Sequence, residues 1–165
     1  MSLYIFDKDK TLLRHVRSRL FFKRSPLKPE EQILRKGVFE KLARLRADGH
    51  QIAIATNQIA VAHGVITAEE AEELVRNCAE KIGGVAAWRM SPYDPKARVW
   101  KNGKSNPFAR DDKSRKPHPG MILEIMEELG YSPKDTFMIG DKKMDKKAAK
   151  AAGVRFIDEK KFFKS

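Results

Sequence analysis

Short apolar runs alternate with segments of helical periodicity along this chain, and this alternation limits the possible folds more than any other feature. The runs that we interpret as strands cover residues 3–6, 51–55, 84–88, 136–139 and 154–157. The segments that we interpret as helices cover residues 35–47, 121–129 and 143–152, with a further helix that begins at Thr67. Strands joined through helices form right-handed crossovers and a mostly parallel sheet. We therefore predict an α/β fold with helices on both faces of a central sheet.

The length and composition fit a single globular domain. The chain has 165 residues, of which 41% are hydrophobic, enough for one core but short for two. We therefore interpret residues 1–165 as one domain. No run approaches the roughly 20 apolar residues of a membrane span, and charged residues interrupt the N-terminal apolar run too early for a signal peptide. The single cysteine, Cys78, cannot form an internal disulfide, so we expect a cytoplasmic protein with no membrane partner.

One helix carries both a start signal and a buried stripe. Thr67 and Glu70 have the spacing of a capping box, in which each side chain binds the backbone of the other residue. Leu74 and Cys78 lie on the apolar stripe of the helix that follows. We therefore interpret Cys78 as a small core residue in preference to a reactive thiol.

The formal net charge of +12 favours anionic partners, either phosphorylated metabolites or nucleic acid. The alternative is that the charge serves solubility, because 34% of the residues are charged and composition alone does not locate a patch.

Polar and charged side chains stand where the predicted strands end. They are Asp7 and Asp9 after the first strand, Thr56 after the second, Lys116 before the helix at 121–129, and Asp141 and Asp145 after the fourth strand. Ligands of such sheets bind beyond the carboxyl ends of the strands. Several carboxylates gathered there would require a hard cation to compensate them. Oxygen donors without His or Cys favour Mg²⁺ over Zn²⁺.

These residue types suit the transfer of a phosphoryl group. One carboxylate can attack phosphorus as a nucleophile and form an aspartyl-phosphate. A second carboxylate, two residues later, can protonate the leaving oxygen and then activate water. Thr56 and Lys116 would hold the phosphoryl oxygens and balance their charge. The alternative interpretation is a set of solvated acidic loops at the strand ends.

The segment from Asp7 to Thr11 (DKDKT), Thr56, Lys116 and Gly140-Asp141 with Asp145 resemble the four signature motifs of the haloacid dehalogenase superfamily of phosphohydrolases. The stretches IATNQIAVAHGVIT, RKPHPGM and MIGDKKMDKKAAKAAG are similar to the subgroup that contains heptose-bisphosphate phosphatases, histidinol-phosphate phosphatases and polynucleotide 3′-phosphatases. The resemblance implies a Rossmann-like three-layer sandwich. Only a basic loop and one helix lie between the first two motifs, which leaves no room for a large cap domain.

The resemblance also implies a role for each matching residue. Asp7 would be the nucleophile and Asp9 the general acid and base, while Thr56 and Lys116 would bind the transferring group. The Mg²⁺ ion would be ligated by Asp7, the backbone carbonyl of Asp9 and Asp141, with support from Asp145. The remaining predicted substrate-binding residues are Asn57, Gln58 and Arg115.

Two lysines flank the predicted acid and base. Lys10 stands where the superfamily most often has glycine, and we expect its side chain to point to solvent in preference to adding charge at the site. Lys8 lies between Asp7 and Asp9. Because alternate strand residues face opposite sides, we expect Lys8 to point away from both carboxylates, so that a metal is the better counter-charge.

The segment from 89 to 117 departs from the resembling phosphatases, which usually carry a zinc-binding loop here. The matching places hold Ser91, Tyr93, Asp112 and Ser114, so we expect no structural zinc and another way of ordering the loop. We interpret His118 as a helix-start residue. The Asn102-Gly103 pair predicts a small hairpin.

An uncapped site suits more than one substrate. Two loops near it, residues 14–29 and 89–117, mix basic and aromatic residues, which suits single-stranded nucleic acid unless the aromatics only pack the loops onto the domain. Our leading hypothesis is a Mg²⁺-dependent phosphomonoester hydrolase of a small phosphorylated metabolite such as a sugar phosphate. The alternatives are a nucleic-acid 3′-end phosphatase and a non-catalytic binding module. We expect a monomer or weak dimer.

Overall fold

A five-stranded sheet forms the centre of the protein, whose computed structural model describes residues 1–17, 23–98 and 103–164. The strands lie in the order β5-β4-β1-β6-β7, and every neighbouring pair is parallel. Their bounds are β1 (Leu3–Phe6), β4 (Gln51–Asn57), β5 (Ala87–Ser91), β6 (Thr136–Gly140) and β7 (Arg155–Asp158). The predicted parallel sheet is therefore confirmed.

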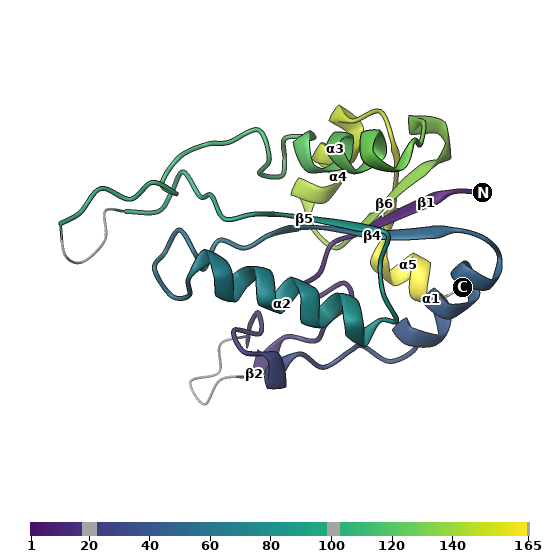
Figure 1. The fold of residues 1–165 in the computed structure, drawn as a ribbon, viewed down its shortest axis with the longest axis horizontal. Helices are drawn as coiled ribbons and strands as arrows, with labels where there is room; N and C mark the ends of the chain where they lie inside the picture. The colour runs from purple at the N-terminus through teal and green to yellow at the C-terminus, as the bar shows by residue number, and fades with distance from the viewer. Residues whose placement is uncertain (18–22, 99–102, 165) are drawn as a thin grey trace.

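Helices cover both faces of this sheet (Figure 1). On one face lie α3 (Gly120–Leu129) and α4 (Lys143–Ala151); on the other lie α1 (Val38–Ala47), α2 (Ala68–Lys81) and α5 (Glu159–Lys164). Two short 3-10 helices span Pro29–Glu31 and Pro133–Asp135. This arrangement confirms the predicted Rossmann-like three-layer sandwich. In the described parts of the chain, no helix is both long enough and apolar enough to cross a membrane.

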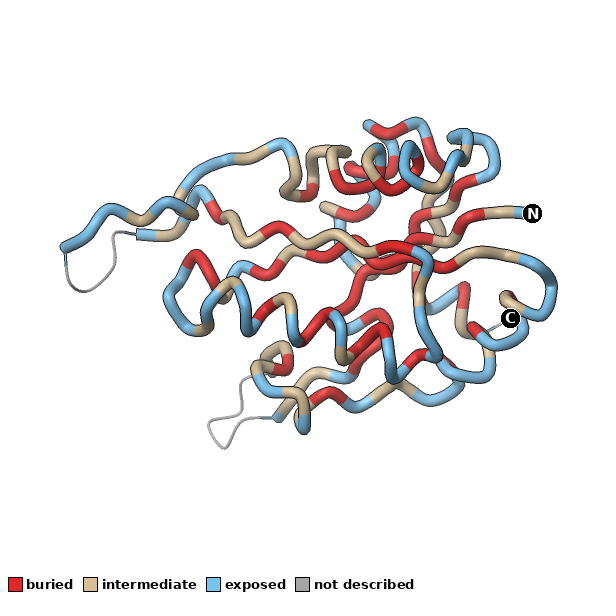
Figure 2. Tube along the Cα trace, in the orientation of Figure 1, coloured by how far each residue is buried: buried red, intermediate tan, exposed pale blue. Residues whose placement is uncertain are grey.

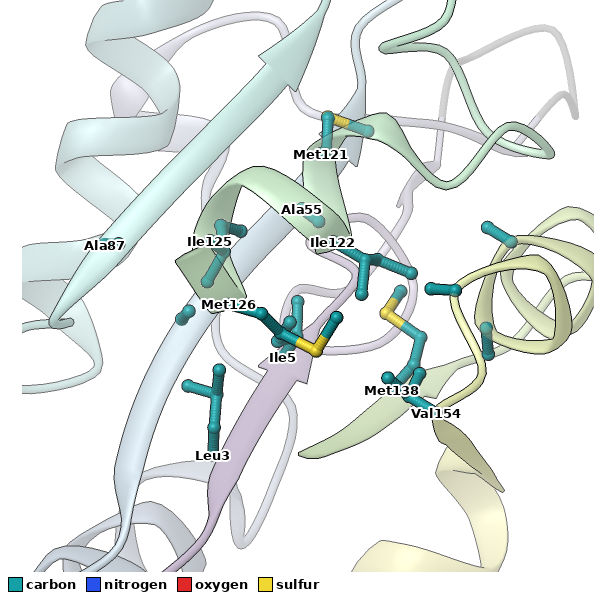
Figure 3. Close-up of a cluster of buried hydrophobic side chains, with 14 residues drawn as sticks. Leu3, Ile5, Ala55, Ala87, Met121, Ile122, Ile125, Met126, Met138 and Val154 are labelled. Atoms are coloured by element: carbon teal, nitrogen blue, oxygen red, sulfur yellow. The ribbon is translucent and has the colours of Figure 1, made fainter. Parts of the chain in front are cut away.

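The side chains of the central strand β1 point alternately to the two faces of the sheet, so β1 contributes residues to both halves of the core. Leu3 and Ile5 pack with the apolar faces of α3 and α4 (Figure 3). Phe6 points to the opposite side, where it packs with the apolar residues of α1, α2 and α5, and Tyr4 lies partly buried among them. A strand buried on both faces reads as a continuous apolar run, which is why the sequence shows this strand so clearly.

Glycines with positive φ explain two boundaries that the sequence placed wrongly. The strand predicted at 84–88 lies at 87–91, because Gly83 and Gly84 adopt φ of 88° and 91° and form a turn before it. The first helix begins at Val38 and not at residue 35, because Gly37 adopts φ of 80° at its N-cap. Only glycine adopts such angles routinely. The capping box predicted at Thr67 is confirmed.

The basic segment at 14–29 is partly ordered. The short strands β2 (Val16–Arg17) and β3 (Lys23–Arg24) pair antiparallel. Arg24 donates two hydrogen bonds to Glu31, of 2.8 and 2.6 Å, which fasten the segment to the 3-10 helix at Pro29–Glu31. Phe21 and Phe22 lie outside the described residues, as do Trp100 and the predicted turn at Asn102.

The segment between β5 and α3 reaches away from the sheet, and the described residues of its outer part are mostly exposed (Figure 2). The Asn106 amide donates to the carbonyl oxygens of Ala62 and Arg98, at 2.6 and 2.9 Å. The rings of Tyr93 and Phe108 pack with centroids 5.9 Å apart. The two described aromatic residues of this loop therefore contact each other within it.

Serine and aspartate side chains form hydrogen bonds with one another at the positions where the resembling phosphatases usually carry zinc ligands. The Ser114 hydroxyl donates to Asp112 Oδ1 at 2.8 Å, and its oxygen lies 3.2 Å from Ser91 Oγ. The Arg110 guanidinium lies 4.5 Å from the centroid of the Tyr93 ring. Hydrogen bonds and a cation–π contact thus order the described part of the loop.

Candidate active site

The carboxyl edge of the sheet brings the predicted acidic residues together. Asp7 directly follows β1 and Asp141 directly follows β6, which is the neighbour of β1 in the sheet. Asp145 lies in the first turn of α4. One carboxylate oxygen from each of the three residues lies within 4.8 Å of the others. The strand order therefore joins residues that are more than a hundred positions apart in the chain.

Lys116 pairs with two members of this cluster and is only 3% exposed. Its Nζ is 2.8 Å from Asp7 Oδ1 and 2.7 Å from Asp145 Oδ1, and it donates to the carbonyl of Ala55 at 2.7 Å. Burial by itself would lower the pKa of Lys116, but the two carboxylates outweigh it and hold the pKa above its usual range. Lys116 is therefore an ammonium at neutral pH.

Asn57 fixes the backbone of Lys116. Its amide nitrogen donates to the Lys116 carbonyl at 2.9 Å, and its amide oxygen accepts from the Lys116 N–H at 3.0 Å. Asn57 ends β4, so this pair of hydrogen bonds ties the turn that carries Lys116 to the sheet. The contacts that the structure shows for Asn57 are positioning contacts.

Asp145 occupies a tight, buried place beside β6. Burial raises its pKa, and the carboxylate of Asp7 acts in the same direction, while Lys116 and the backbone N–H of Lys142 favour the ionised form. A Cβ on Gly140 would come within 2.5 Å of Asp145 Oδ2. A residue without a side chain is therefore required at 140 for Asp145 to reach the cluster.

Both oxygens of Asp9 have partners. Lys8 donates to Asp9 Oδ1 at 2.7 Å, and Gln58 donates to Asp9 Oδ2 at 3.0 Å. The Gln58 nitrogen also lies 2.9 Å from Thr56 Oγ1. Gln58 therefore links the predicted acid and base to Thr56, the last buried residue of β4.

The expectation that Lys8 points away from the carboxylates is wrong. The side chain is fully buried and its ammonium pairs with Asp9. The reason is local: β1 ends at Phe6, and the Lys8 carbonyl accepts hydrogen bonds from the N–H groups of Leu12 and Leu13. The chain curls into a turn here, so strand alternation does not continue through Asp9.

We expected the Lys10 side chain to point to solvent, and this expectation is wrong for its ammonium group. Its side chain is 55% exposed, but Nζ lies 3.1 Å from Asp141 Oδ2. Its φ of 67° makes it the one non-glycine residue with positive φ among the described residues. This angle explains why glycine would suit the position, and the ion pair shows what the lysine contacts instead.

The buried carboxylate oxygens Asp7 Oδ2 and Asp141 Oδ1 have no hydrogen-bond partner within the described part of the chain. Asp145 Oδ1 also has no hydrogen bond there, but it lies 2.7 Å from Lys116 Nζ. A buried polar atom that has no hydrogen-bond partner is unfavourable. A hard cation would satisfy the oxygens of Asp7 and Asp141, and carboxylates at this spacing are the ligands that Mg²⁺ takes in proteins. The residues present therefore fit a Mg²⁺ site at Asp7, Asp141 and Asp145.

Arg115, which we predicted to bind substrate, is held by contacts within the protein. Its side chain is 12% exposed, and it donates to the carbonyls of Tyr93 and Lys116 at 3.1 and 3.2 Å. It also pairs with Asp94 at 3.4 Å. In this arrangement Arg115 joins Tyr93 and Asp94, near the start of the long loop, to the backbone of Lys116 near its end.

The sequence analysis missed a second acidic group beside the site. Asp94 is buried and lies 2.8 Å from His63. Burial would raise the pKa of Asp94, but His63, the backbone N–H of Lys96 and Arg115 outweigh it and lower the pKa. A single aspartate in an irregular polar loop leaves no periodic signal, so only the spatial arrangement reveals it.

Comparisons with known proteins find a family model and relatives that resemble this chain. A family model described as haloacid dehalogenase-like hydrolase matches residues 108–158, which include Lys116, Asp141 and Asp145. The D-glycero-beta-D-manno-heptose-1,7-bisphosphate 7-phosphatase of Pasteurella multocida is 28% identical over 123 residues, which cover 72% of this chain and 63% of that protein. The protein of the same name from Escherichia coli is 30% identical over 122 residues, covering 72% of this chain and 61% of that protein.

The chain thus spans less than two thirds of the length of these relatives. Among solved structures, D,D-heptose 1,7-bisphosphate phosphatase from B. bronchiseptica, in complex with magnesium and phosphate, superposes with a TM-score of 0.73. It is 26% identical, and the match covers 94% of this chain and 79% of that one. The family model over residues 108–158, the relatives and the shared fold agree with the resemblance to haloacid dehalogenase-like hydrolases that the sequence motifs carry.

Proposed function

We propose that this protein is a Mg²⁺-dependent phosphomonoester hydrolase of a small phosphorylated metabolite such as a sugar phosphate. The observation that carries the proposal concerns the partners of the two carboxylate oxygens of Asp7. One of its oxygens pairs with Lys116 at 2.8 Å, and the other is buried without a partner among the described residues. The names of the relatives, which are heptose bisphosphate phosphatases, support a sugar phosphate as the substrate class.

In the first half of the reaction, a carboxylate oxygen of Asp7 attacks phosphorus. The bond between phosphorus and the leaving oxygen breaks, and Asp9 gives its proton to that oxygen. The product is an alcohol and a phosphoryl group bound to Asp7. Lys116 and the Thr56 hydroxyl bind the phosphoryl oxygens and balance their charge.

In the second half, Asp9 accepts a proton from water as the water attacks phosphorus. The bond between phosphorus and Asp7 breaks, which restores the carboxylate and releases inorganic phosphate. Asp7, Asp141 and the Asp9 backbone carbonyl would hold Mg²⁺, with support from Asp145. The ion supplies positive charge that lets an anionic nucleophile approach an anionic substrate.

Asn57, Gln58 and Arg115 serve this reaction as positioning residues in our proposal. Asn57 and Arg115 bind the backbone of Lys116, and Gln58 bridges Asp9 and Thr56. Direct contact of these three residues with substrate stays a prediction.

The nucleic-acid alternative receives no specific support from the described loops. Base stacking needs exposed aromatic faces, whereas Tyr93 and Phe108 pack against each other and Arg110 lies over the Tyr93 ring. The alternative therefore becomes an outcome of the substrate test.

A panel of sugar phosphates, other phosphorylated metabolites and 3′-phosphorylated oligonucleotides, assayed for phosphate release with and without MgCl₂, tests the proposal. We expect Mg²⁺-dependent turnover of a sugar phosphate, loss of activity in Asp7→Asn, and unchanged activity in Lys143→Ala, which alters an exposed lysine of α4. Preference for oligonucleotides would favour the alternative. Turnover that is independent of Mg²⁺ would contradict the proposal.

A further inference from the structure

Lys10 is held at the edge of the carboxylate cluster by its backbone. The Arg35 guanidinium donates to the Lys10 carbonyl at 2.8 Å and to the Thr11 carbonyl at 3.3 Å. Arg35 itself pairs with the buried carboxylate of Glu159. The turn that gives Lys10 its φ of 67° is therefore anchored to α5, and the direction in which the Lys10 side chain leaves the backbone is fixed.

The lysines that pair with the three clustered carboxylates differ in their exposure to solvent. Lys116 pairs with Asp7 and Asp145, is 3% exposed and is also tied to a backbone carbonyl. Lys10 is 55% exposed, and among the described residues its ammonium pairs with Asp141 Oδ2. The other oxygen of Asp141 is buried and has no partner among the described residues. Lys10 is thus the more solvent-exposed of the two lysines.

We propose that Lys10 competes with a divalent cation for Asp141 and thereby sets the metal affinity of the site. The inference rests on the metal site of the proposed function. An ammonium on one oxygen of Asp141 neutralises part of the charge that attracts a cation to the other oxygen, and it repels a doubly charged ion only a few ångströms away. Cation binding must therefore overcome this repulsion or turn the Lys10 side chain out to solvent.

Because Lys10 is half-exposed, screening by water reduces the effect well below that of a buried pair. A unit charge about 5 Å from a divalent ion in an aqueous surface environment changes the binding constant by about tenfold. Removing the charge at residue 10 should therefore tighten Mg²⁺ binding by about tenfold.

The experiment measures Mg²⁺ binding itself, by isothermal titration calorimetry with MgCl₂ and no substrate. Lys10→Gly and Lys10→Asn both remove the charge and both tolerate positive φ. Lys10→Arg keeps the charge. Lys143→Ala removes a charge from an exposed position at the same edge of the sheet and is the matched control. Thermal melting without Mg²⁺ shows whether each variant is folded.

The expected result is a dissociation constant about tenfold lower in Lys10→Gly and Lys10→Asn, and close to the wild-type value in Lys10→Arg and Lys143→Ala. Equal affinity of the wild type and both uncharged variants would overturn the inference while leaving the metal site in place. Tightening in Lys10→Gly alone would overturn it too, because relief of backbone strain and not charge would then be the cause. Failure of the wild type and of every variant to bind Mg²⁺ would overturn the proposed metal site as well.

Discussion

Replacing Lys116 by methionine removes the ammonium that Asp7 and Asp145 share. Methionine keeps most of the length of the side chain, so the change acts chiefly on charge. Two buried carboxylates then face each other without compensation, and the Ala55 carbonyl loses its donor. Breaking a buried ion pair in this way destabilises a protein by about 3–5 kcal/mol, a large share of the about 5–15 kcal/mol that holds a domain folded.

The assay is urea unfolding at neutral pH, with and without MgCl₂. The pKa of folded Lys116 lies above its usual range, so its contribution to stability is fully present below a pH of about 10 and is lost only as the pH rises through the pKa of the folded state. The whole loss should therefore appear at neutral pH. Mg²⁺ should recover more stability in Lys116→Met than in the wild type, because the ion replaces the missing positive charge.

Lys113→Met is the matched control, since Lys113 is exposed in the same turn, and it should change stability by less than about 0.5 kcal/mol. The reasoning would be refuted if Lys116→Met unfolded at the same urea concentration as the wild type without Mg²⁺. That result would mean that the carboxylates do not depend on Lys116 for their compensation.

Three further predictions concern single contacts. Gly140→Ala should lower the catalytic rate constant at least about tenfold, since its Cβ would displace the carboxylate of Asp145; steady-state kinetics would show it, and wild-type rates would contradict the required close approach. Burial raises the pKa of the Cys78 thiol to about 12, so a thiol reagent at pH 8 should modify Cys78 only as fast as the protein unfolds; rapid labelling of the folded protein would argue against a core position. Arg24 lowers the pKa of Glu31 from 4.5 to about 2, so the ion pair stabilises the fold above pH 4.5 and this stabilisation is lost as the pH falls towards 2. Chemical unfolding at several pH values should show that the free energies of unfolding of the wild type and Glu31→Gln become equal at low pH. A difference between the two that stays the same at every pH would contradict the pairing.

The parts of the fold that follow from regular periodicity could be predicted from the sequence. The parallel sheet and the helices depend on repeating apolar positions. The capping box of α2 depends on a fixed spacing between two residues, Thr67 and Glu70. The acidic residues of the site could also be placed, since parallel strands bring their carboxyl ends to one edge. Asp7 and Asp141 meet for this reason despite their separation in the chain.

The partners of the flanking lysines could not be predicted. Strand alternation predicts the direction of the Lys8 side chain only if β1 continues through Asp9. The strand ends at Phe6, so the prediction does not hold. The position of the Lys10 ammonium depends on a turn with positive φ that a sequence pattern does not encode for lysine. Asp94 and His63 meet through an irregular loop, where no periodicity relates residues that contact each other.

The central claim, that Asp7 attacks phosphorus, is tested most directly by trapping the phosphorylated enzyme. Protein mixed with an aryl phosphate and MgCl₂ is quenched in acid during turnover, and the peptide that contains Asp7 is measured by mass spectrometry. We expect the added mass of one phosphoryl group on Asp7, lost on treatment with hydroxylamine and missing from Asp7→Asn. Turnover by Asp7→Asn at the wild-type rate, or a phosphoryl group on another residue in its place, would contradict the account.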